Sequence, residues 1–134
     1  PRGFALIREL RRTLIESEAG VLAPCPHAGS CPIVGNDWCH FSARVQRSAL
    51  HRQVKEADLS HEDEKFSYIA FMRTPTRRAA ARVLRHPQRP PRRVQLVACT
   101  DSGLRKITLG KSHPAYKIAK DIKWGSALPE EALQ

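Results

Sequence analysis

The chain has 134 residues, about one domain, because domains cluster near ~100–150 residues. Its 41% hydrophobic content and mean hydropathy of −0.45 exclude a mainly disordered chain, and no apolar run approaches the ~18–20 residues that cross a bilayer. The 23 Lys and Arg residues outnumber the 13 Asp and Glu residues, which gives a net charge of +10. This charge favours a polyanionic partner, such as a nucleic acid or, less often, an anionic membrane surface.

The chain opens with Pro1-Arg2-Gly3-Phe4, without Met and without a signal peptide. We therefore expect a segment of a longer protein. Four cysteines are too few for a disulfide scaffold, so we expect an intracellular, reducing compartment, where clustered cysteines more often bind metal.

The first predicted element is an amphipathic helix over residues 2–18, because apolar residues recur at helical spacing from Phe4 to Leu14. The helix is expected to stop at Gly20. Prolines and glycines then interrupt residues 23–39, so no regular element continues through them. A shorter helix is predicted over residues 48–56, followed by an acidic turn over residues 61–64.

The second half of the chain predicts strands. Residues 66–72 are apolar on both faces, which indicates a central strand of a sheet. Residues 94–99 and 104–109 flank the turn residues 100–103 and predict an antiparallel hairpin. A last helix is expected over residues 114–123. Together these elements predict an α/β domain without internal repeats.

The four cysteines have the spacing C-x5-C-x7-C-x59-C. Cys25, Cys31 and Cys39 lie in the Gly/Pro-rich segment, and Cys99 ends a predicted strand. Four thiolates around one centre suit either tetrahedral zinc or a cubane iron–sulfur cluster. Structural zinc sites usually pair cysteines ~2–4 residues apart, so these gaps fit zinc poorly.

Other interpretations of these residues stay open. Buried thiols without a metal are common, although they have no reason to cluster in a loop so poor in regular structure. His27 and His40 are alternative ligands of a mixed zinc site, but solvated loop histidines are commoner. Catalysis has little support, because the acidic residues 62–64 suit a solvated turn and Ser42 beside His40 lacks a third partner.

Two stretches of the sequence resemble a known family. They are Ala23-Pro24-Cys25-Pro26-His27 through Asp37-Trp38-Cys39-His40-Phe41-Ser42, and Glu62-Asp63-Glu64-Lys65-Phe66-Ser67-Tyr68. They resemble the methyltransferase-like assembly factors of the small ribosomal subunit, known from mitochondria and with bacterial relatives. The resemblance extends from Pro1 to Gly125.

This resemblance implies that Cys25, Cys31, Cys39 and Cys99 ligate a [4Fe-4S] cluster of structural role. It also implies that the chain binds small-subunit rRNA in the assembling small ribosomal subunit, in the mitochondrial matrix if the source is eukaryotic and in the cytoplasm if it is bacterial. The implied fold is the C-terminal portion of a class I methyltransferase-like α/β fold. Residues 1–20 would be a helix of that domain, 21–60 a Cys-rich metal-binding insertion, 61–128 the strand, basic segment, hairpin and final helix, and 129–134 a tail.

No G-x-G-x-G cofactor loop follows a strand in this sequence. Any S-adenosylmethionine site would therefore lie upstream in the full-length protein, and we do not expect this chain to be catalytic alone. Two alternatives remain: an RNA methyltransferase in which this segment recognises the substrate, and a zinc-stabilised RNA-binding module. No membrane partner is expected.

A basic segment without any acidic residue lies between Glu64 and Asp101. Arginine makes bidentate contacts with phosphate, and the prolines of this segment would keep it extended along a nucleic-acid backbone. The alternative is a solvated loop kept soluble by its charge. The predicted RNA-binding residues are Arg73, Arg77, Arg78, Arg82, Arg85, Arg89, Arg92 and Arg93. Possible members of a second basic face are Lys111, Lys117, Lys120 and Lys123.

Overall fold

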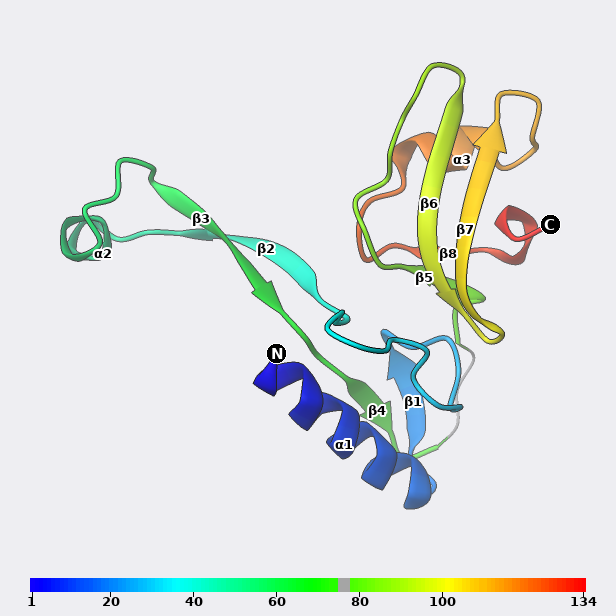
Figure 1. Ribbon diagram of the computed structural model, residues 1–134, viewed down its shortest axis with the longest axis horizontal. Helices are drawn as coiled ribbons and strands as arrows, with labels where there is room; N and C mark the ends of the chain where they lie inside the picture. The colour runs from blue at the N-terminus through cyan, green and yellow to red at the C-terminus, as the bar shows by residue number, and fades with distance from the viewer. Residues whose placement is uncertain (75–77) are drawn as a thin grey trace.

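The computed structural model describes residues 1–74 and 78–134. Its strands form two two-stranded sheets and one four-stranded sheet, and every pairing among them is antiparallel. A long two-stranded ribbon projects from the rest of the molecule, and the four-stranded sheet packs against a short helix (Figure 1). The predicted mixture of helices and strands is confirmed. The class I methyltransferase-like arrangement stays a prediction.

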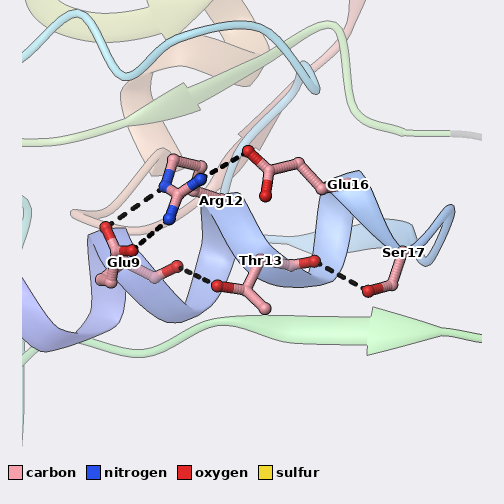
Figure 2. Close-up of polar contacts among 5 residues, drawn as sticks. All are labelled: Glu9, Arg12, Thr13, Glu16 and Ser17. Carbon is pink, nitrogen blue, oxygen red and sulfur yellow. Dashed lines mark hydrogen bonds and ion pairs between the residues drawn. The ribbon is translucent and has the colours of Figure 1, made fainter.

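Helix α1 (Arg2–Glu16) has one buried stripe and one charged face. The buried residues are Phe4 and Arg11, two helical turns apart, so they lie on the same side of the helix. On the opposite side Arg12 forms ion pairs with Glu9 and Glu16 (Figure 2). The predicted helix is therefore confirmed, although it ends two residues earlier than expected.

Strand β1 (Gly20–Ala23) pairs with β4 (Ala70–Met72). The prediction of one central strand over residues 66–72 is wrong, because Phe66 ends strand β3 (His61–Phe66) and residues 67–69 belong to no strand. The hydroxyl of Ser67 donates to the carbonyl of Cys39 at 2.6 Å. Residues 66–72 are apolar on both faces because they pair with two different strands: Phe66 pairs with β2 in the ribbon, and residues 70–72 pair with β1.

The projecting ribbon consists of β2 (Phe41–Gln46) and β3, joined through α2 (Ala49–Val54) at its tip (Figure 1). The predicted helix over residues 48–56 is confirmed, and the Ser48 hydroxyl caps it by accepting from the His51 amide at 3.1 Å. The predicted acidic turn over residues 61–64 is wrong. These residues form β3, because their carboxylates face basic residues across the ribbon.

The ribbon should lose order in acid. The Arg47 and Arg44 side chains hydrogen-bond Glu62 and Asp63, which lowers the pKa of each carboxyl below its usual value of 4.5 or 3.8. A carboxyl with a lowered pKa in the folded state contributes stability above its usual pKa, and this is lost as pH falls through the folded value. We expect amide hydrogen exchange in β2 and β3, corrected for intrinsic rates, to accelerate below about pH 4.

Strand β6 (Arg93–Thr100) provides the control for this measurement, because neither it nor its partner β7 (Gly103–Gly110) contains an acidic residue. Protection in β6 should persist at the pH where the ribbon loses it. Equal loss in both pairs would contradict a role for the two ribbon ion pairs.

The four-stranded sheet has the order β7-β6-β5-β8, where β5 is Ala81–Val83 and β8 is Ala127–Leu128. Strands β6 and β7 confirm the predicted hairpin, and α3 (Tyr116–Asp121) confirms the last helix in shorter form. The 3-10 helix η1 (Glu130–Ala132) buries Ala132, so the expected tail packs in the core. The main core of this sheet comprises Ala81, Val83, Val94, Leu96, Ala98, Ile107, Leu109, Ala115, Ala119, Ile122, Leu128 and Ala132.

A second cluster of buried residues joins α1 to the far face of this sheet. Alternation along β6 places Val94, Leu96 and Ala98 in the main core, so Cys99 lies on the opposite face. There it packs with Phe4, Ile33, Phe41 and Leu84. No helix among residues 1–74 and 78–134 has the length and apolar character needed to cross a membrane.

Candidate metal centre

All four cysteines line one cavity. Helix α1 closes one side of it, residues 24–39 surround it, and β6 reaches it through Cys99. Most other lining residues are apolar, among them Phe4, Ile33 and Leu84. The structure therefore brings together Cys25, Cys31, Cys39 and Cys99 in an apolar enclosure.

The cysteine loop, residues 24–40, has no helix or strand, and individual contacts hold it. Ile33 is 2% exposed and anchors the loop in the second cluster. The Asp37 carboxylate accepts from Trp38 N–H at 2.8 Å and pairs with Arg85 at 2.6 Å. Its buried residues are Pro24, Pro26, His27 and Ile33, so packing stabilises only parts of the loop.

Burial and mutual repulsion oppose ionisation of the thiols. Burial, together with the neighbouring thiols, raises the pKa of Cys39 and of Cys99 to about 12. Burial also raises the pKa of Cys25, while hydrogen bonding and charge from Arg11 oppose that rise. Metals bind thiolates, so a positive centre among these sulfurs would reverse the preference for the neutral form.

Among residues 1–74 and 78–134, no group of three or more His, Cys, Asp or Glu side chains is arranged to hold a metal ion. Of the two candidate histidines, His27 is buried rather than solvated, and its ring Nε2 lies 3.4 Å from the Cys99 sulfur. Burial and the Arg11 charge lower the pKa of His27, which favours its neutral form. His40 stacks on Trp38, with ring centroids 4.0 Å apart.

Arg11 is a residue of this site that the sequence did not single out. Its side chain is 7% exposed, its Nη2 donates to the His27 carbonyl at 2.8 Å, and its Nε is buried without a hydrogen-bond partner. The available signal was position: Arg11 follows Phe4 by seven residues and so shares the buried stripe of α1.

Three of the predicted RNA-binding arginines hydrogen-bond to the chain itself. Arg82 donates to the carbonyls of Pro24 at 3.1 Å and Gly125 at 3.0 Å. Arg89 donates to the carbonyls at the end of α3, at Lys120 and Ile122, while Arg85 pairs with Asp37. These contacts join the basic segment to the cysteine loop and to the C-terminal part of the chain.

The other predicted arginines that the structure describes lie on the surface. Arg73 and Arg78 are exposed, and Arg77 lies outside the described residues. Arg92 and Arg93 line a shallow depression together with Lys111, which belonged to the expected second basic face. The exposed residues Lys117, Lys120 and Lys123 lie on or just after α3. We call the group of Arg92, Arg93 and Lys111 the basic depression.

Replacing Arg82 with methionine should lower the free energy of unfolding by about 1.5–3 kcal/mol, because the variant cannot form the hydrogen bonds of a charged, half-buried donor. Urea unfolding measures this change. The salt dependence of RNA binding should stay the same, since the guanidinium is occupied within the chain. A folded variant of unchanged stability and weaker RNA binding would contradict the structural role.

A family model described as "Mitochondrial small ribosomal subunit Rsm22" matches residues 1–129, nearly the whole chain. A search of curated proteins returned no match.

Proposed function

The chain belongs to the mitochondrial small ribosomal subunit Rsm22 family, and from this premise we propose that it is an assembly factor that binds small-subunit rRNA and holds a structural [4Fe-4S] cluster. Family membership relates the chain to the small ribosomal subunit and suggests the mitochondrial matrix as its compartment. The convergence of the four cysteines on one cavity is the observation that carries the proposal furthest.

The residues of the cavity fit a cluster by their chemistry. Four thiols are the soft donor set of a cubane, and among residues 1–74 and 78–134 the cavity lining contains no carboxylate or imidazole. A cubane binds each thiolate at a different iron, which suits sulfurs placed around a space. A single zinc ion would instead need all four sulfurs within ~2.3 Å of one point.

The four cysteines would cross-link the cysteine loop to β6, in addition to the contacts that Arg82, Arg85 and Ile33 already make between the loop and the rest of the chain. A bound cluster supplies iron–thiolate bonds between the cysteine loop and β6. Cys99 offers a rigid attachment, because it lies in a strand paired on both sides. Cys25, Cys31 and Cys39 offer three attachments along the loop, whose ordering costs ~1–2 kcal/mol per residue in backbone entropy. Metal–thiolate bonds can offset that cost.

The proposed rRNA contact rests on charge and exposure. Arg92, Arg93 and Lys111 converge on one depression, and all three side chains are exposed. Among the described residues, the ion pairs of the chain include none of these three. Their charges are therefore available to phosphates, which position an RNA without reading its sequence.

Anaerobic purification followed by iron, sulfide and zinc analysis tests the cluster. We expect a brown protein with about four irons and four sulfides per chain. A colourless protein with one equivalent of zinc and no sulfide would instead identify the zinc-stabilised RNA-binding module. Labelled methyl transfer to RNA by the full-length protein would favour the methyltransferase alternative.

A further inference from the structure

A buried cation without an acidic partner stands beside the cysteines. Arg11 is 7% exposed and lines the same cavity as the four thiols. Burying a charge is costly unless it is paired, and the ion pairs found among residues 1–74 and 78–134 do not include Arg11. Arg12, its neighbour on the exposed face, is paired with two glutamates (Figure 2).

The guanidinium of Arg11 is only partly satisfied by neutral groups. One nitrogen donates to the His27 carbonyl at 2.8 Å, whereas the buried Nε has no partner in the protein. A buried donor left unpaired is costly, so its retention calls for an acceptor. Thiolate sulfurs lining the cavity would be such acceptors.

The His27 ring brings a second nitrogen, beside those of Arg11, close to one of the cysteine sulfurs. Its ring Nε2 lies 3.4 Å from the Cys99 sulfur, and the residue is 9% exposed. Arg11 holds the backbone of this same residue through the His27 carbonyl. Arg11 therefore approaches the sulfurs from α1 as part of the cavity lining, and His27 approaches the Cys99 sulfur from the cysteine loop.

We propose that Arg11 and His27 are positioning residues for the cysteine thiolates, which they stabilise by charge and by hydrogen bonding, and that they thereby raise the reduction potential of the bound cluster and slow its loss. This inference rests on the proposed function. Hydrogen bonds to cluster sulfurs and nearby positive charge both favour the more negative, reduced state. Removing either should therefore lower the potential.

The test compares three variants of the anaerobically purified holoprotein. Arg11→Met removes the charge and the donors, Arg11→Lys keeps the charge, and Arg8→Met removes an exposed charge from the same helix and the same cavity lining. Redox titration followed by electron paramagnetic resonance gives each midpoint potential. We expect a clear downward shift for Arg11→Met, a smaller one for Arg11→Lys, and the smallest for Arg8→Met because solvent screens that charge.

Iron release to a chelator gives a second readout. Arg11→Met should release iron about tenfold faster. Replacing a residue that hydrogen-bonds a metal ligand typically weakens metal binding ~10–100-fold, and tenfold is the lower end of that range. His27→Leu should act in the same direction, and His27→Gln, which retains a side-chain N–H donor, should lie closer to the unmodified protein. If Arg11→Met fails to fold, the Arg11→Lys potential and the His27 pair still decide the question.

The outcomes separate this inference from the function on which it rests. Unmodified protein without iron and sulfide would overturn the proposed cluster and this inference with it. If the unmodified protein holds the cluster but the midpoint potential of Arg11→Met is no lower than that of Arg8→Met, this inference alone is overturned and the proposed function stands. Equal iron release from His27→Leu and His27→Gln would overturn the part assigned to the His27 donor.

Discussion

Replacing Cys99 with serine is expected to lower the free energy of unfolding of the iron-loaded protein by about 4 kcal/mol, comparable to the loss of a native disulfide. Cys99 is the one proposed ligand that lies in the four-stranded sheet, so its loss should release the cysteine loop from β6. Anaerobic thermal and urea unfolding measure the change. Hydrogen exchange should show the greatest loss of protection in residues 24–40.

Two controls make this result specific. Ser30→Ala changes an exposed residue of the same loop and should leave the stability within about 0.5 kcal/mol of the original. After iron is removed, the Cys99→Ser chain should differ less from the unmodified chain, because only the burial of a hydroxyl in an apolar cluster then separates them. A difference as large without iron as with it would contradict the cross-linking role of Cys99.

Replacing Arg92, Arg93 and Lys111 together with alanine should weaken binding to small-subunit rRNA similarly for all sequences tested. Each phosphate that the variant no longer binds should reduce the slope of log affinity against log salt by roughly 0.7–0.9, so the triple variant should have a slope smaller by about 2–2.7. Fluorescence anisotropy across a series of salt concentrations measures both quantities. Stability should change little, because all three residues are exposed.

The matched control removes the same charge elsewhere. Lys117, Lys120 and Lys123 are exposed on or beside α3, and their replacement with alanine also lowers the net charge by three. In this variant, the slope of log affinity against log salt should stay close to that of the unmodified protein. Equal reductions of slope in the two triple variants would mean that overall charge, and not the basic depression, attracts the RNA.

Local patterns in the sequence were enough to predict α1, α2 and the β6–β7 hairpin. Their apolar residues repeat at helical or strand spacing, and turn residues mark the ends of the hairpin. Residues 66–72 misled the prediction because they serve two different sheets within a few residues. The acidic residues of β3 suit a strand only because Arg44 and Arg47 face them, and pairing of that kind is visible only in the structure.

The site shows the same division between local and long-range information. Two features can be read in the sequence: the clustering of Cys25, Cys31 and Cys39, and the alternation that places Cys99 on the face of β6 opposite Val94, Leu96 and Ala98. The spacing of Arg11 from Phe4 places it on the buried stripe of α1, but the sequence does not show that the covering residues are the cysteines and His27. The Arg82 contacts depend on carbonyls 58 and 43 residues away, so charge density alone could not separate Arg82 from Arg92.

Strand β6 spans the distance between the two proposed interaction sites. Arg93 is its first residue, at the basic depression, and Cys99 is its seventh, at the cavity. Six intervals of ~3.3 Å separate their Cα atoms by about 20 Å. This is about twice the Debye length of ~10 Å at 0.1 M salt. Ions in solution therefore screen each site from the other, and a change of one electron at the cysteines should leave the electrostatic attraction of the depression for phosphate almost unchanged.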